Sequence, residues 1–198
     1  EELQAKGVGS VIWANQFDNT ANYEFHAKTT AREIYDQLDG KIDGFTCAIG
    51  TGGTLAGTSV GLKELNPDIK IACTDPQGAT MYRYFKDSVL EVTGDPSETE
   101  GIGQARITKN VEACLIDMAY HISDKEAFEL LYKLIKPEGL FLGTSCGVNI
   151  AGAMQMAKEM GPGKNIVTIL CDDAYKYFSK MFNKDFLKSK NLPIPDWL

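Results

Sequence analysis

The sequence predicts an α/β fold with three layers, in which a parallel-type sheet is flanked by helices on both sides. Short apolar runs alternate along the chain with longer segments whose apolar residues recur at helical spacing. Strands separated by helices of this length form parallel βαβ units. The chain has 198 residues, of which 43% are hydrophobic, and this is enough for one core, or for one domain and part of another.

Apolar periodicity locates the elements in chain order. Short apolar runs predict strands at residues 8–13, 44–49, 70–74 and 166–171. Apolar residues at helical spacing predict helices at residues 22–38, 55–65, 123–136 and, directly after Ser145, up to residue 160. Gly40 is placed to end the first helix, and Ser123 and Glu126 have the spacing of a capping box.

Two segments lack this periodicity. Glycines and a proline interrupt residues 76–110, and a stretch of this length without clear elements is usually a functional loop region, so we expect mobility there. Residues 186–198 contain two prolines and end in Trp197 and Leu198. This composition predicts an extended arm whose aromatic residue packs on the body of the protein or on a second subunit.

The charge balance and the cysteines restrict the classes of partner and compartment. The chain has 20 basic and 27 acidic residues and no basic run, which argues against nucleic acid or an anionic membrane surface as a partner. A small polar metabolite fits better. The five cysteines form no C-x-x-C pair and lie mostly in apolar runs, as free thiols of a reducing compartment do, so we expect a cytoplasmic protein.

No apolar run reaches membrane-spanning length, and the first residues lack the basic start and apolar middle of a signal peptide. The first residue is glutamate, which suggests that the chain is a piece of a longer protein.

The most informative segment is Gly50-Thr51-Gly52-Gly53-Thr54, which joins the strand at 44–49 to the helix at 55–65. A helix start of this kind holds unpaired backbone N–H groups and the positive end of the helix dipole, and the two threonines add hydroxyl groups. We therefore expect it to bind a phosphate group.

Other interpretations of this turn remain open. A dinucleotide fingerprint needs a third glycine where Leu55 stands, and a P-loop needs a lysine that is absent. Asp75 ends the strand at 70–74, about where an acidic residue holds a ribose hydroxyl, so a nucleotide site stays as an alternative. The simplest alternative is that Gly52 and Gly53 only form a tight turn.

The remaining candidate groups give weaker signals. His26 and His121 are too few for a hydrolase triad or a histidine metal cluster, and we predict no metal site. Asp172 and Asp173 follow a strand, where two adjacent carboxylates are more often a cap and a solvated side chain than a cation site. Cys146 begins a helix as a candidate nucleophile, but no histidine is near it in sequence, and the neighbouring Ser145 fits a helix N-cap.

Five motifs, in this order and at these separations, together resemble a known family. They are Gln16–Asn22, Gly50–Thr54, Glu100–Gly103, Glu138–Gly139 and Gly143–Gly147. The family is that of cysteine synthase (O-acetylserine sulfhydrylase), among the fold-type II pyridoxal phosphate enzymes that also include cystathionine β-synthase. The resemblance covers nearly the whole chain.

The resemblance implies a role for each matching position. The loop Gly50 to Thr54 (Gly50, Thr51, Gly52, Gly53 and Thr54) matches the segment that holds the phosphate of pyridoxal 5′-phosphate, and Ser145 matches the serine whose hydroxyl meets the pyridine nitrogen. Gln16 matches the glutamine that helps to hold the substrate carboxylate. Gly101 lies in the mobile segment over the cofactor mouth. By the same comparison Cys146 only packs, and Asp75 loses the ribose role.

The chain departs from the family in one respect that concerns catalysis. The Schiff-base lysine of the family stands well before the motif that Gln16 begins, in a context that no lysine of this chain has. We therefore expect no catalytic residue in this chain. Residues 1–19 are expected to be the last strand and link of a smaller domain that is otherwise absent, and residues 20–198 the domain that binds the cofactor phosphate.

The function implied by the resemblance is β-replacement, in which O-acetylserine and sulfide give cysteine and acetate. Two alternatives remain: a serine-using enzyme like cystathionine β-synthase, and a non-catalytic module that binds a phosphate ligand or a partner protein. A homodimer and docking to serine acetyltransferase are further expectations from the family.

Overall fold

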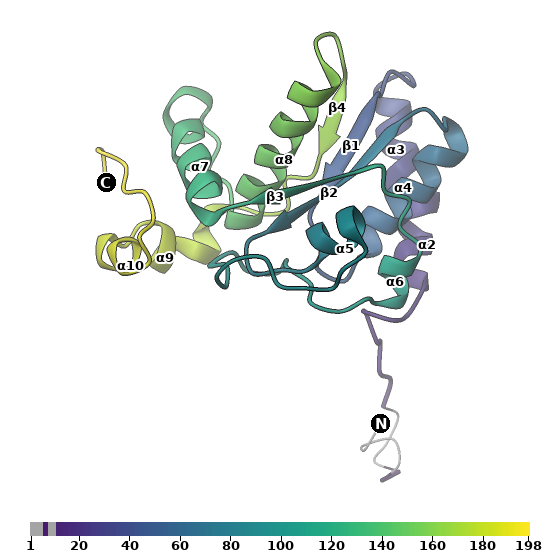
Figure 1. Cartoon of the computed structure of the whole chain (residues 1–198), viewed down its shortest axis with the longest axis horizontal. Coiled ribbons are helices and arrows are strands. Elements are labelled where there is room, and N and C mark those ends of the chain that lie inside the picture. Colours follow the sequence, from purple (N-terminus) through teal and green to yellow (C-terminus); the bar gives the residue numbers. More distant parts are fainter. Residues whose placement is uncertain (1–5, 8–10) are drawn as a thin grey trace.

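The computed structural model describes residues 6–7 and 11–198, and its centre is a sheet of four parallel strands (Figure 1). The strands are β1 (Gly44–Cys47), β2 (Lys70–Pro76), β3 (Met118–Ile122) and β4 (Ile166–Thr168). Their order in the sheet is β3-β2-β1-β4, and each of the three pairings is parallel. The predicted α/β class with a parallel sheet is confirmed.

Helices cover both faces of this sheet (Figure 1). One side has α2 (Ala21–Lys28), α3 (Thr30–Gln37) and α4 (Gly53–Leu65), and the other has α7 (Asp124–Glu138) and α8 (Thr144–Met160). Short helices occupy the connection between β2 and β3 and the C-terminal region: α5 (Met81–Asp87), α6 (Lys109–Glu112), η1 (Ala174–Tyr177), α9 (Phe178–Met181) and α10 (Lys184–Ser189).

The core has one part on each face of the sheet, because successive strand residues point to opposite sides. Phe45 and Ile71 are fully buried and pack in one cluster with Leu62 of α4. Ala72, the neighbour of Ile71, belongs to the opposite cluster, together with Val148 of α8. The sheet is therefore covered on both sides, as is usual for parallel strands.

Helices α2 and α4 approach so closely that two positions in α4 have no room for a side chain. A Cβ atom on Gly57 would collide with the carbonyl oxygen of Tyr23, and one on Gly61 would lie 2.5 Å from the carbonyl oxygen of Ala27. Backbone contact of this kind places the first residues of α2 against the start of α4. The site described below depends on that contact.

The helix predicted for residues 22–38 is in fact two helices, and the prediction of one continuous helix was wrong. Helices α2 and α3 meet at Thr29. The Thr29 hydroxyl donates a hydrogen bond of 2.8 Å to the carbonyl oxygen of Phe25. Threonine bonded back in this way often bends a helix, and here it coincides with the break.

The other predicted elements agree in position and differ mainly at their ends. Residues 8–10 of the strand expected at 8–13 lie outside the described residues, and residues 11–13 belong to no strand. Helix α5 lies within the region expected to be a loop. Strand β3 was not predicted, because it is an edge strand with partly exposed residues and a polar His121 within a short run.

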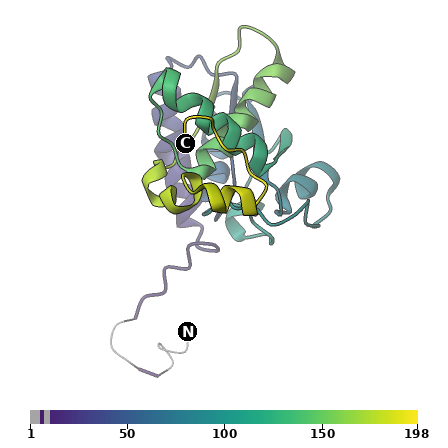
Figure 2. The same cartoon turned by 90° about the vertical axis from the view of Figure 1, so that its left-hand side faces the viewer.

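The C-terminal arm packs on the body of the chain, which was one of the two predicted positions. The Trp197 ring lies 6.0 Å from the ring of Tyr132 in α7, and the Lys136 ammonium lies 5.8 Å from the centre of the Trp197 ring. In Figure 2 the arm and α10 lie against the side of the molecule that faces the viewer.

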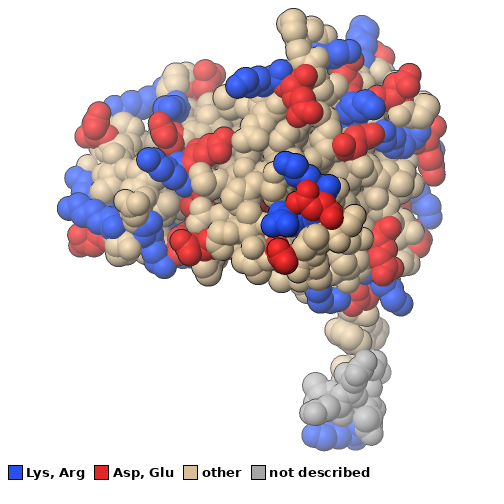
Figure 3. Space-filling model, in the orientation of Figure 1, with Lys and Arg blue, Asp and Glu red and all other residues tan. Residues whose placement is uncertain are grey.

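The surface in Figure 3 has basic and acidic side chains interspersed over the visible face. Within the described part of the chain, no helix is long and apolar enough to cross a membrane.

The contact between α2 and α4 gives a stability test. We expect Gly57→Ala to lower the free energy of unfolding by about 1–3 kcal/mol, because the added methyl group overpacks a backbone contact. Helix propensity alone gives the opposite sign, a gain of about 1 kcal/mol. Urea unfolding measures the difference, and Glu64→Ala, at an exposed position of α4, is the matched control. A stabilised Gly57→Ala variant would contradict the close approach.

Candidate functional site

A cavity of about 260 Å³ lies beyond the carboxyl ends of β1 and β4. Parallel α/β sheets generally bind their ligands at this edge. The lining residues come from the end of β1, the β1–α4 turn, the segment before α6, helix α8 and the end of β4: Cys47, Ala48, Gly50, Thr51, Gly52, Thr54, Leu55, Gly101, Ile102, Asn149, Ile169 and Cys171. The fold thus brings the predicted turn and the predicted Gly101 to one cavity.

The glycines of the turn are required by its backbone. Gly52 is the N-cap of α4 and has φ +94°, a conformation that residues with a side chain rarely adopt. A Cβ atom on Gly53 would collide with the side-chain oxygen of Asn22. A Cβ atom on Gly50 would lie 2.5 Å from the carbonyl oxygen of Gly101. The three glycines of the turn are therefore needed because Asn22 lies against one side of the turn, Gly101 lies against the other, and Gly52 has a positive φ.

The turn presents unpaired backbone donors at the start of α4. Within residues 6–7 and 11–198, the N–H groups of Gly52, Thr54 and Leu55 have no hydrogen-bond acceptor. The backbone hydrogen bonds of α4 begin with the Ala56 N–H, which donates to the carbonyl oxygen of Gly52. The described residues that line the cavity have no charged side chain. The backbone donors and the positive end of the α4 dipole are thus the main attraction for an anion.

The two threonine hydroxyls of the turn already have protein partners. Thr51 Oγ1 accepts hydrogen bonds from the Asn22 amide at 3.0 Å and from the Gly53 N–H at 3.3 Å. Its own proton remains available for donation. Thr54 Oγ1 lies 3.4 Å from Nε2 of His26, whose pKa is lowered by burial. The Thr51 proton is therefore available to a phosphate in the turn, and the Thr54 proton is available as well when Nε2 of His26 is the donor.

Asn22 connects the turn to Gln16, the residue predicted to hold the substrate carboxylate. The Asn22 amide nitrogen donates to the Gln16 carbonyl oxygen at 2.8 Å as well as to Thr51. Asn110 donates to the same carbonyl oxygen at 3.2 Å. The backbone of Gln16 is thereby fixed beside the turn, and the residue is exposed outside the cavity lining.

The segment around Gly101 is anchored on both sides of the cavity mouth. On one side the Gly103 N–H donates to the Ile49 carbonyl oxygen at 2.9 Å, and the Gln104 amide donates to the Gly50 carbonyl oxygen at 3.0 Å. On the other side Glu100 pairs with Lys180 of α9 at 2.6 Å. Gly101 itself is exposed and has φ +80°.

Ser145 lies in the first turn of α8, next to the cavity and nearly buried, with an exposed fraction of 4%. Its hydroxyl is hydrogen-bonded to the thiol of Cys171, which lines the cavity. The adjacent Cys146 is fully buried, and a hydrogen bond from the Cys171 thiol lowers the pKa of Cys146 to about 6.

Asn149 is a site residue that the sequence analysis missed. Its side-chain oxygen accepts from the Ala48 N–H at 2.8 Å, and its nitrogen donates to the Ile169 carbonyl oxygen at 2.8 Å. It thus joins the ends of β1 and β4 through α8. Its position one helical turn after Ser145 was the signal available in the sequence.

The remaining candidates lie elsewhere or have structural partners. Asp75 is fully buried at the end of β2, where its Oδ2 accepts from the Tyr82 N–H at 2.8 Å, and it does not line the cavity. Asp173 caps η1, as the simpler prediction had it, and Asp172 accepts from the Tyr177 hydroxyl at 2.8 Å. Among the described residues no group of three or more His, Cys, Asp or Glu is arranged to hold a metal.

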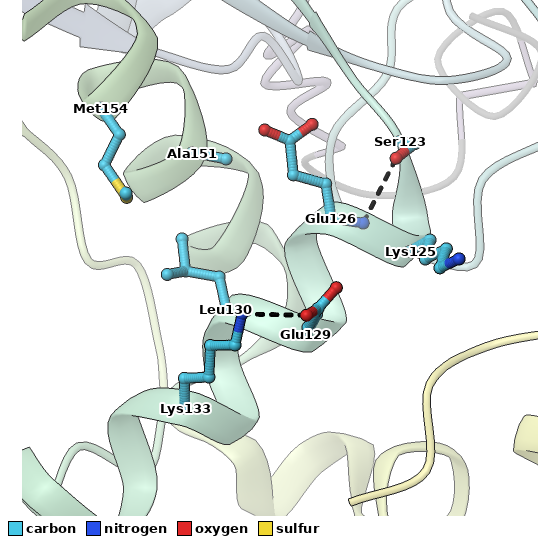
Figure 4. A pocket seen from close by; sticks show the side chains of 8 residues that line it. All are labelled: Ser123, Lys125, Glu126, Glu129, Leu130, Lys133, Ala151 and Met154. Carbon is cyan, nitrogen blue, oxygen red and sulfur yellow. Dashed lines mark hydrogen bonds and ion pairs between the residues drawn. The ribbon is translucent and has the colours of Figure 1, made fainter. Parts of the chain in front are cut away.

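A separate cavity of about 310 Å³ lies between α7 and α8 (Figure 4). Leu130 and Met154 provide its apolar wall, and charged residues such as Glu129 and Lys133 surround it. Glu129 and Lys133 pair with each other at 2.9 Å. None of the site residues predicted from the sequence lines this cavity.

Fold and site together define a class: a parallel α/β protein with a glycine turn that presents free N–H groups to an uncharged cavity. The chain belongs to the family of pyridoxal-phosphate dependent enzymes, whose pattern matches residues 1–172. The family, fold class and cofactor predicted from the motifs are therefore confirmed.

Individual relatives give the same family. The chain is 43% identical to cysteine synthase 1 of Neurospora crassa, over 98% of this chain and 53% of the relative, and 42% identical to cysteine synthase 1 of Emericella nidulans, over 95% and 52%. The crystal structure of an O-acetylserine dependent cystathionine β-synthase from Helicobacter pylori superimposes with a TM-score of 0.79 at 33% identity, over 90% of this chain and 56% of that one. The chain spans about half the length of these relatives.

Asp75 gives a test by pH. Burial raises the pKa of its carboxyl group to about 7, from an ordinary value near 4. Between these pH values the folded protein binds a proton that the unfolded chain has released, so the free energy of unfolding falls as the pH rises from about 4 to about 7. Asp75→Asn removes this dependence, and we expect the variant to gain stability relative to the wild type over that range.

Urea unfolding at several pH values measures the effect. Asp68→Asn, at an exposed position, is the control and should leave the pH dependence of the wild type unchanged. Parallel pH profiles for the wild type and Asp75→Asn would rule out the raised pKa.

Proposed function

We propose that this chain holds pyridoxal 5′-phosphate in the cavity beyond β1 and β4, with the loop Gly50–Thr54 around the phosphate. The observation that carries the proposal is the set of unpaired N–H groups of Gly52, Thr54 and Leu55 at the start of α4. These donors suit a phosphate monoester, since they lie at a helix N-terminus. The family assignment supports the same ligand.

The proposed reaction is β-replacement, in which O-acetylserine and sulfide give cysteine and acetate. When bound, the cofactor supplies an electron-withdrawing ring that stabilises negative charge at the α-carbon of an amino acid. Ser145 is proposed to offer its hydroxyl to the ring nitrogen. A hydroxyl is a neutral partner and leaves that nitrogen largely unprotonated, which suits departure of a group from the β-carbon.

Gln16 and Gly101 are proposed to act on the substrate. The Gln16 backbone is held by Asn22 and Asn110, so its side chain starts from a fixed point beside the turn, where it is proposed to bind the substrate carboxylate. Gly101 has no side chain over the cavity mouth and is proposed to let its segment move when substrate enters. Its anchors at Gly103 and Glu100 limit that movement to a few residues.

The catalytic lysine is proposed to lie outside residues 1–198. Two observations support this: no lysine lines the cavity in the described part of the chain, and the relatives are about twice as long as the match. In the same proposal, residues 1–19 are the last strand and link of a smaller domain, and residues 20–198 bind the cofactor phosphate. Ile12 and Trp13 have exposed fractions of 90% and 56%, as expected if further protein covers them.

The leaving group and nucleophile have one alternative, serine with homocysteine, as in cystathionine β-synthases. The Helicobacter pylori relative is named for both O-acetylserine and cystathionine, so the two chemistries are close. Steady-state rates of the complete enzyme with each substrate pair distinguish them, and higher kcat/KM with serine and homocysteine would overturn the cysteine synthase assignment. A cytoplasmic location, a homodimer and docking to serine acetyltransferase belong to the same proposal.

Gly52→Asp tests the phosphate loop. We expect it to lower the affinity for pyridoxal phosphate at least about tenfold, because a carboxylate at the turn repels the phosphate and the added side chain would lie 2.7 Å from the Val111 side chain and 3.0 Å from its backbone nitrogen. Equilibrium dialysis of the purified protein measures binding without requiring turnover. Gly163→Asp, in an exposed turn with φ +78°, is the matched control. Unchanged affinity in Gly52→Asp would refute the assignment of the loop to the phosphate. It would also refute the alternative that the chain is a non-catalytic module that binds a phosphate ligand through this loop.

Ser145→Ala separates binding from chemistry. The variant should retain cofactor affinity within about fivefold, since the loss of one hydrogen bond has a net cost of about 1 kcal/mol. Turnover of the complete enzyme should fall, because the ring nitrogen loses its partner. Dialysis and steady-state rates measure the two effects. A variant with full turnover would remove Ser145 from the proposed site.

A further inference from the structure

Two cysteines meet at the edge of the cavity from distant parts of the chain. Cys146 lies in the first turn of α8, and Cys171 follows β4. The Cys171 N–H donates to the Cys146 sulfur at 3.2 Å, so the two residues are in direct contact.

The two thiols differ in access. Cys146 is fully buried, whereas Cys171 is exposed and lines the cavity. A small molecule in the cavity thus reaches the Cys171 sulfur first and meets Cys146 only behind it. Cys47 also lines the cavity, but it is buried in the core cluster under the sheet, and burial raises the pKa of its thiol.

The two thiols also differ in ionisation. A hydrogen bond from the Cys171 thiol lowers the pKa of Cys146 to about 6, whereas the same hydrogen bond and burial raise the pKa of Cys171. The Asn149 amide nitrogen donates to the Cys171 sulfur at 3.6 Å. The pair therefore combines an accessible thiol, Cys171, with a resolving partner that ionises readily, Cys146.

We propose that Cys146 and Cys171 form a dithiol that hydrogen peroxide oxidises to an intramolecular disulfide at the edge of the cavity. The Cys171 sulfur attacks one peroxide oxygen, the O–O bond breaks, the thiol proton of Cys171 passes to the departing oxygen, and a sulfenic acid and water form. The Cys146 thiolate then attacks the Cys171 sulfur, the S–S bond forms, the S–O bond breaks, and hydroxide leaves. Each sulfur loses one electron, and the peroxide takes both.

The disulfide changes the edge of the cavity beside Ser145. The first turn of α8 becomes covalently tied to the end of β4, and the Ser145 hydroxyl loses a thiol partner. A reductant that exchanges thiols restores the pair, so the oxidation is reversible. Transient disulfides of this type occur in compartments that keep other thiols reduced.

The test counts thiols and maps the bond in the purified protein. The reduced protein is treated briefly with hydrogen peroxide, unfolded, alkylated and digested with trypsin, which cuts between Cys146 and Cys171 at Lys158 and Lys164. We expect free thiols to fall from five to three per chain, the two peptides to be joined with the loss of two hydrogens, and dithiothreitol to reverse the change. Neither step requires the cofactor or activity.

Variants identify the role of each sulfur. Cys146→Ser should stop at the sulfenic acid, so that dimedone labels Cys171 in this variant and not in the wild type. Cys171→Ser should keep its remaining thiols, because Cys146 is buried. Cys114→Ser is the control and should form the same disulfide as the wild type. Five remaining thiols in the wild type, a Cys47–Cys171 bond, a bond between two chains, or a loss that dithiothreitol does not reverse would each overturn the proposal.

Discussion

The site depends on close contact between backbones at positions where only glycine fits. Gly53 meets Asn22, Gly50 meets the carbonyl of Gly101, and Gly57 and Gly61 meet α2. These contacts bring together segments that are far apart in the sequence and hold the N-terminus of α4 open toward the cavity. A side chain at any of them separates two segments of the site, so local sequence and long-range geometry are linked there.

Asparagine side chains form hydrogen bonds between the segments that the glycine contacts bring together. Asn22 links Gln16 to Thr51, Asn110 holds the carbonyl groups of Gln16 and Phe17, and Asn149 joins β1 to β4. Each amide has several hydrogen-bonding positions, so one side chain can bond to two segments at once. Because these amides are neutral, they fix the loops without adding charge to the cavity.

The sequence was sufficient for the parts of the structure that depend on local pattern. Strand β1, the turn at Gly50–Thr54 and helix α4 follow from apolar periodicity and glycine chemistry, which are readable in one segment. The break at Thr29 and the edge strand β3 were missed because tertiary packing decides them. The roles of Asn149 and Cys171 were missed because each depends on a partner that is distant in the chain, and single-sequence patterns contain no such contact.

The described lining of the cavity has helix N-termini near it as positive groups, and no cationic side chain. Its described lining has no lysine or arginine, yet the N-termini of α4 and α8 both lie at the carboxyl edge of the sheet, each with about half a positive charge from its dipole. The start of α4 has free N–H groups for a phosphate, and the start of α8 has Ser145 and the ionisable pair Cys146 and Cys171. The same field that favours phosphate at one helix favours thiolate at the other. The proposed cofactor binding and the proposed thiol oxidation at this edge thus have one electrostatic origin, which is the parallel arrangement of the strands that places both helix starts on the same side.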